Sequence, residues 1–112
     1  MNTSSSDRGR ILIVDDNDKV LDLLVDLLTE EGYEVSAASD GTRALGLAVS
    51  FAPDVILSDV VMPELDGLEL CRRLKDDPRT TNIPILLMSG LRRSDDDGLV
   101  GLYAHLKRCC DA

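Results

Sequence analysis

Aromatic residues are scarce in this 112-residue chain, which has no tryptophan, one phenylalanine and two tyrosines. Leu, Val, Ile and Ala must therefore build the core, as is typical where helices pack on a parallel sheet. Basic residues are also few, because 12 Lys and Arg are outnumbered by 21 Asp and Glu, giving a net charge of −9. This excess of acid disfavours binding to nucleic acid and to acidic membrane surfaces, and it suits a divalent cation or a basic partner.

Long apolar runs are absent as well. No run reaches the roughly 18 residues of a transmembrane helix, and residues 1–10 lack the apolar segment of a signal peptide. We therefore expect a cytoplasmic protein with no membrane contact. The cysteines are Cys71, Cys109 and Cys110. They form no paired framework, and we expect them to be reduced thiols.

The length allows one domain with a single core. Polar residues 1–9, with three serines, predict a disordered N-terminal tail, which leaves a folded domain over residues 10–112. Within it, apolar runs predict strands over residues 10–14, 33–38, 55–57 and 83–88. Helical periodicity predicts helices from residue 17 or 18 to Gly32, between Gly41 and Pro53, and over residues 65–75, with Leu68, Cys71 and Leu74 pointing inward. Such alternation predicts right-handed βαβ units and a doubly wound α/β fold with a parallel sheet of four to five strands.

Polar side chains follow three of the predicted strands, namely Asp15-Asp16, Asp59 and Ser89. Because the carboxyl ends of parallel strands meet at one edge of a sheet, we expect these side chains to lie together. An isolated Asp-Asp pair is usually a helix cap, but three carboxylates at one edge repel one another and favour a divalent cation. Oxygen-only ligands indicate Mg²⁺. A central carboxylate can then act as a nucleophile and become an aspartyl phosphate.

Three stretches of the sequence resemble the response-regulator receiver family: Ile11–Asn17, Asp54–Pro63 with Asp66-Gly67, and Pro84–Ser89. The resemblance runs from about residue 10 to about residue 94 and implies a flavodoxin-like receiver fold. It also implies a phosphorylation-dependent switch of a two-component system. A sensor histidine kinase, a phosphotransfer protein or a small phosphodonor would supply the phosphoryl group, and a downstream target protein would read it. Such a domain is no enzyme in the ordinary sense, because its autophosphorylation is stoichiometric.

The resemblance also assigns roles to single residues. In the family, position 61 and the second residue after the switch hydroxyl tune the lifetime of the phosphoryl group. Here both are apolar, Val61 and Leu91, so we expect slow self-dephosphorylation. The assigned roles are phosphoacceptor for Asp59, direct Mg²⁺ ligand for Asp16, water-linked neighbour for Asp15, backbone-carbonyl ligand for Val61 and switch hydroxyl for Ser89.

The C-terminal end departs from the family pattern. The family continues through a helix, a fifth strand with a Lys-Pro pair and a fifth helix, and the residues after Ser89 are too few for all of these. One interpretation is a single helix over Ser94–Arg108, with acids first and bases last. The other is a short strand near Ala104–Lys107, in which Lys107 takes the role of the family lysine. In both, the last helix is missing, which should expose apolar sheet surface and favour a homodimer, a covering partner or low stability.

Other functions fit less well. A receiver-like protein-interaction module that works without phosphorylation remains the main alternative, and a phosphodonor response would separate the two. A phosphatase with an aspartyl nucleophile would need a second acid where Val61 stands, and dinucleotide binding would need a glycine-rich turn after the first strand. His105 with Cys109 and Cys110 matches no zinc-ligand spacing.

Overall fold

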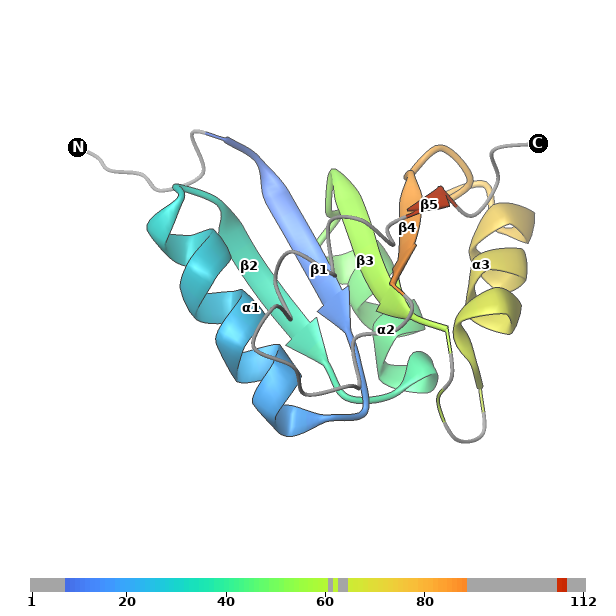
Figure 1. The fold of residues 1–112 in the computed structure, drawn as a ribbon. Coiled ribbons are helices and arrows are strands. Elements are labelled where there is room, and N and C mark those ends of the chain that lie inside the picture. The colour runs from blue at the N-terminus through green and yellow to red at the C-terminus, as the bar shows by residue number, and fades with distance from the viewer. Residues whose placement is uncertain (1–7, 61, 63–64, 89–106, 109–112) are drawn as a thin grey trace.

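A computed structural model describes residues 8–60, 62, 65–88 and 107–108 of the chain. Its sheet has the strand order β2-β1-β3-β4-β5. The first four strands pair in parallel, so the predicted parallel α/β sheet is confirmed (Figure 1). This order is that of the flavodoxin-like fold. The strand bounds are Arg10–Val14 for β1, Glu34–Ala38 for β2, Val55–Asp59 for β3, Ile85–Met88 for β4 and Lys107–Arg108 for β5.

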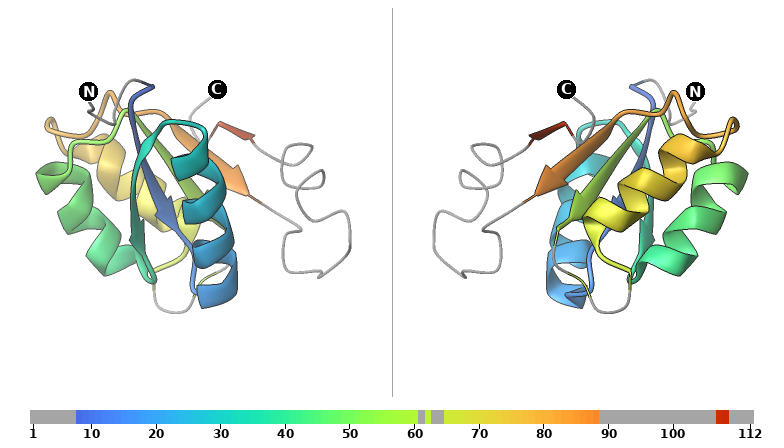
Figure 2. Two further views of the ribbon diagram at one scale, coloured as in Figure 1. Left: turned by 90° about the vertical axis from the view of Figure 1, so that its left-hand side faces the viewer. Right: turned by 90° about the vertical axis from the view of Figure 1, so that its right-hand side faces the viewer.

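Helices cover both faces of this sheet, with α1 on one face and α2 and α3 on the other (Figure 2). The helix bounds are Asp18–Glu30 for α1, Gly41–Ser50 for α2 and Gly67–Asp76 for α3. Each helix begins after a side chain that accepts backbone N–H groups of the first turn, namely Asn17, Asp40 and Asp66. None of the helices in the described ranges is long and apolar enough to cross a membrane.

The core lies in two layers because successive strand residues point to opposite faces of the sheet. On β1, Ile11 and Ile13 pack toward α1, where Leu21 and Leu24 are buried. Leu12 and Val14 pack instead toward α2 and α3. The side chains that α2 and α3 contribute to this second layer are Ala44, Ala48, Leu70, Cys71 and Leu74. Burial of each large aliphatic side chain contributes about 1.5–3 kcal/mol, and the two layers together fix the strand ends that carry the site.

Helix α3 differs from its prediction in its start and in its inward face. It begins at Gly67 rather than at residue 65, because Asp66 caps it from outside. Leu68 was expected to point inward, but it is 58% exposed. The buried positions are 67, 70, 71 and 74, which is one continuous stripe at helical spacing. Leu70 therefore occupies the inward position that Leu68 was expected to fill.

The C-terminal strand β5 also differs from the prediction. It runs antiparallel to β4, with Lys107 opposite Leu87 and Arg108 opposite Leu86. A single helix reaching Arg108 is therefore wrong at its end. Pairing satisfies backbone groups at the outer edge of β4, which an unpaired strand would leave open. Lys107 does lie in a strand, as the second interpretation expected, but residues 94–106 lie outside the described residues.

At the other end of the domain, the described chain begins with Arg8 and Gly9. The Gly9 carbonyl accepts a hydrogen bond from the Glu34 backbone N–H at 2.9 Å, which adds one bond next to the β1–β2 ladder. The rest of the predicted tail, residues 1–7, lies outside the described residues.

The cysteine prediction is wrong at Cys71, a buried residue of α3. Cys71 is disulfide-bonded in the structure rather than a reduced thiol. A disulfide requires two Cα atoms within about 7 Å, and sequence spacing does not reveal which cysteines a fold brings that close. Cys109 and Cys110 lie outside the described residues.

Candidate metal centre

The candidate site lies where two neighbouring parallel strands end. Strands β1 and β3 pair along their length, with Val14 opposite Ser58 at the carboxyl end. Asp15 and Asp16 directly follow β1, and Asp59 is the last residue of β3. The sheet grows from β1 toward β2 on one side and toward β3 on the other, and ligands of open α/β sheets bind at this kind of switch point.

The three carboxylates converge there. One oxygen from each of Asp15, Asp16 and Asp59 lies within 4.8 Å of the other two. Asp15 is 3% exposed and Asp59 8%, whereas Asp16 faces solvent. Burial of carboxylates is costly unless a cation or hydrogen-bond donors compensate their charge. A cluster that offers only hard oxygen ligands, with Asp16 exposed to solvent, fits Mg²⁺.

Local backbone geometry places Asp15. Its backbone N–H donates to the Ala38 carbonyl at 3.1 Å, which extends the β1–β2 ladder by one bond. Its carboxylate accepts the backbone N–H of Asn17 at 2.8 Å. The Asn17 side chain in turn accepts the N–H groups of Lys19 and Val20 at the start of α1. The turn from β1 into α1 therefore holds the first acid of the cluster.

Contacts from β3 and α3 place the backbone at Asp59. The Ser58 hydroxyl, which is fully buried, donates to the Asp59 carbonyl at 2.9 Å. The Gly67 N–H, at the first residue of α3, donates to the Val60 carbonyl at 2.8 Å. Neither Ser58 nor Gly67 was predicted to take part in the site. Gly67 stood in the motif that carries the resemblance, but a motif does not tell what a residue contacts.

The roles of the other predicted site residues stay predictions. Val61, Ser89 and Leu91 lie outside the described residues. Lys107 lies in β5, where it pairs opposite Leu87. Of the predicted site residues, the three acids Asp15, Asp16 and Asp59 are therefore brought together.

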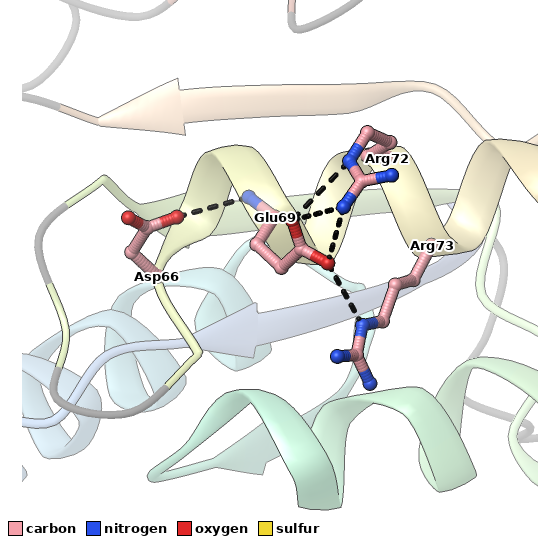
Figure 3. Close-up of polar contacts among 4 residues, drawn as sticks. All are labelled: Asp66, Glu69, Arg72 and Arg73. Carbon is pink, nitrogen blue, oxygen red and sulfur yellow. Dashed lines mark hydrogen bonds and ion pairs between the residues drawn. The ribbon is translucent and has the colours of Figure 1, made fainter.

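The exposed face of α3 carries its own charge network (Figure 3). The Glu69 carboxylate is 2.7 Å from Arg72 and 3.0 Å from Arg73. Hydrogen bonds from Arg72 and then Arg73 lower the pKa of Glu69, and the bond to Glu69 raises the pKa of Arg72. Asp66 accepts the Glu69 N–H at 2.9 Å in the same turn. Both arginines thus have a partner on the helix that begins at Gly67.

Many known proteins are similar to this chain in sequence. The chain matches the response regulator receiver domain family over residues 11–107. It is 52% identical over 83 residues to the response regulator PleD of Caulobacter vibrioides. This alignment covers 74% of this chain and 18% of that protein. It is 41% identical over 87 residues to the DNA-binding dual master transcriptional regulator RpaA of Synechocystis, covering 78% of this chain and 36% of that protein. The chain thus spans well under half the length of these two relatives.

Solved structures of similar proteins have the same fold. The Vibrio cholerae chemotaxis protein CheY4 superposes with a TM-score of 0.71 at 30% identity, covering 86% of this chain and 78% of that one. The N-terminal domain of a response regulator receiver protein from Methanoculleus marisnigri also gives a TM-score of 0.71, at 35% identity, covering 73% of this chain and 67% of that one. Receiver domains are signalling switches of two-component systems, and they bind Mg²⁺ in an acidic pocket. This chain belongs to the response regulator receiver domain family.

Proposed function

We propose that this domain is a phosphorylation-dependent switch that accepts a phosphoryl group on Asp59 with the help of Mg²⁺. The observation that carries the proposal is the approach of the Asp15, Asp16 and Asp59 carboxylate oxygens to within 4.8 Å of one another. Family membership supports the same role for these positions. Asp15 and Asp16 follow one strand and Asp59 ends its neighbour, so the fold brings Asp59 close to the two acids that would hold the ion.

The proposed reaction transfers a phosphoryl group from the donor to Asp59. An Asp59 oxygen would attack phosphorus and form an acyl phosphate, while the bond from phosphorus to the donor oxygen or nitrogen breaks and its electron pair leaves with the donor. A bound Mg²⁺, held by Asp16 directly, by Asp15 through water and by the Val61 carbonyl, would offset the negative charge of the transferring group. Ser89 would donate its hydroxyl to a phosphoryl oxygen.

Intact-mass measurement tests this directly. We expect the protein in MgCl₂ and acetyl phosphate to gain one phosphoryl group, which EDTA prevents and hydroxylamine removes as from an acyl phosphate. Asp59→Asn should abolish the adduct. Asp54→Asn is the matched control, because Asp54 precedes the same strand at its opposite end, where it is exposed and accepts the Arg10 N–H at 2.8 Å. This control should be phosphorylated like wild type.

A folded wild-type protein without an adduct would overturn the proposal. The same result would favour the alternative, a receiver-like module that binds its partner without phosphorylation. An adduct that persists in Asp59→Asn would also contradict the assignment, because the modified residue would then lie elsewhere.

We further propose that the phosphoryl group is lost slowly. Val61 and Leu91 are both apolar, and neither can orient an attacking water molecule. Val61→Asn should shorten the lifetime of the adduct, measured by mass after removal of the phosphodonor. An unchanged lifetime would contradict this part of the proposal.

The partners follow from the same switch. A sensor histidine kinase or a phosphotransfer protein would supply the phosphoryl group, and a downstream target would bind the modified form. The net charge of −9 favours basic surfaces on these partners. Homodimerisation remains a prediction, which sedimentation before and after phosphorylation would test.

A further inference from the structure

The first residue of α3 touches the backbone of the proposed phosphoacceptor. A Cβ atom at Gly67 would overlap the Asp59 carbonyl oxygen, and it would lie 3.0 Å from the Val60 Cα and 3.1 Å from the Asp59 carbonyl carbon. All three neighbours are backbone atoms, so no change of rotamer could relieve the overlap. Any side chain at position 67 would have to move either α3 or the end of β3.

The backbone conformation does not explain the glycine. Gly67 is helical and is not among the described glycines with positive φ, which are Gly9 and Gly32. Alanine is the better helix former, so helix propensity would favour replacement at this position. The close approach of the Asp59 carbonyl is therefore the remaining physical reason for a glycine at position 67.

The peptide next to Asp59 is held more firmly by α3 than by the sheet. The Val60 N–H reaches the Met88 carbonyl of β4 at a long 3.4 Å, whereas the Gly67 N–H reaches the Val60 carbonyl at 2.8 Å. The Ser58 hydroxyl donates a hydrogen bond to the Asp59 carbonyl at 2.9 Å. The Asp59 side chain branches from the Cα atom that directly precedes this carbonyl, so the position of its carboxylate depends on these contacts.

We propose that Gly67 is a positioning residue, and that seating of α3 on the Asp59 carbonyl sets the place of the Asp59 carboxylate relative to Asp15 and Asp16. Ser58 assists by fixing the same carbonyl. This inference deepens the proposed function and rests on it. A merely structural glycine would affect stability alone, whereas a positioning glycine also determines Mg²⁺ affinity and the rate of phosphoryl transfer.

Gly67→Ala tests the inference against Gly46→Ala. Gly46 also lies in a helix, but an added Cβ would meet nothing within 4 Å. The Mg²⁺ dissociation constant is obtained from the rise in unfolding midpoint with MgCl₂, without any phosphodonor. The phosphorylation rate is measured with saturating acetyl phosphate, at a temperature where each variant is folded by circular dichroism.

We expect Gly67→Ala to weaken Mg²⁺ binding and to slow phosphorylation by roughly ten- to a hundredfold, as displacements near 1 Å do. Gly46→Ala should behave like wild type in both measurements, and Ser58→Ala should show a smaller loss of the same kind. If folded Gly67→Ala matches Gly46→Ala in Mg²⁺ affinity and rate, the inference is wrong. Should Gly67→Ala fail to fold, Ser58→Ala decides: a wild-type affinity and rate in that variant would overturn the inference, and a loss of both would support it.

The wild-type protein separates this inference from the proposed function. Absence of both Mg²⁺ stabilisation and the phosphoryl adduct in wild type would overturn the proposed function and the inference with it. A functional wild type with an unaffected Gly67→Ala would overturn the inference alone.

Discussion

The Asp15 carboxylate accepts the backbone N–H of Asn17 at 2.8 Å, while the Asn17 side chain caps α1 through Lys19 and Val20. One short turn therefore joins a buried acid of the candidate site to the start of a helix. The side-chain oxygen of Asn17 accepts two backbone N–H groups of the first turn that have no partner within the helix. The backbone N–H of Asn17 compensates part of the Asp15 charge. Stability of α1 and geometry of the site are consequently linked at this turn.

Asn17→Ala should lower the free energy of unfolding by about 1 kcal/mol, because alanine cannot accept the capping hydrogen bonds. Urea unfolding followed by circular dichroism measures the change. Asn82→Ala is the control, since Asn82 is an exposed residue of the turn before β4. Equal losses in the two variants would contradict the capping role of Asn17.

Asp16→Asn should stabilise the protein in EDTA and abolish its stabilisation by Mg²⁺. Removing one of three carboxylates that lie within 4.8 Å of one another relieves repulsion. Because Asp16 is exposed and solvent screens its charge, we expect a gain of about 1 kcal/mol without metal. Wild type should gain about 2.7 kcal/mol when Mg²⁺ is at a hundred times its dissociation constant.

Thermal unfolding in EDTA and across a series of MgCl₂ concentrations gives both quantities. Asp22→Asn is the matched control, since Asp22 lies on the exposed side of α1 and its substitution removes the same charge. If Asp16→Asn and Asp22→Asn respond alike to Mg²⁺, Asp16 is no ligand and the effect reflects net charge.

Much of this architecture could be predicted from sequence because each signal was local and repeated. The apolar runs of β1 and β3 mark strands buried on both faces, and Asn17 or Asp18 marks the start of α1. The parallel topology then brings together Asp15, Asp16 and Asp59, which are distant in the chain. For these acids, the rule that strand ends share an edge was sufficient.

Other features depend on packing between elements and left no local signal. The burial of Leu70 instead of Leu68 depends on which face of α3 packs on the sheet, and residues two apart point about 200° away from each other around a helix. The antiparallel pairing of β5 with β4 joins residues that are far apart in the chain. The contact of Gly67 with the Asp59 carbonyl joins two elements across a loop, so only the fold reveals it.

Thr80→Val should destabilise the protein by about 1–2 kcal/mol. The Thr80 side chain is buried, and its hydroxyl donates to the Leu74 carbonyl in the last turn of α3 at 2.6 Å. Valine keeps the shape but removes the donor, and loss of a buried hydrogen bond has this magnitude. Urea unfolding measures the loss, with Thr42→Val on the exposed surface of α2 as the control. A change within 0.5 kcal/mol for Thr80→Val, as expected of a surface substitution, would show that the bond contributes little.

The Glu69 network on α3 should stabilise the protein above pH 4.5 and lose its effect in acid. Hydrogen bonds from Arg72 and Arg73 lower the pKa of Glu69 below its ordinary value of 4.5 in the folded state. The unfolded chain therefore takes up a proton before the folded one, so stability falls as pH drops through the lowered pKa. Because these side chains are exposed, the effect is small and screened by salt.

Comparison of wild type with Glu69→Gln isolates this contribution. In low salt, the urea midpoint of wild type should exceed that of Glu69→Gln at pH 7, and the two should converge as the pH falls below 4.5. In 1 M NaCl the difference at pH 7 should shrink, since the screening length falls to about 3 Å. A difference that persists at low pH would instead reflect packing of the Glu69 side chain, because glutamine and protonated glutamate are both uncharged.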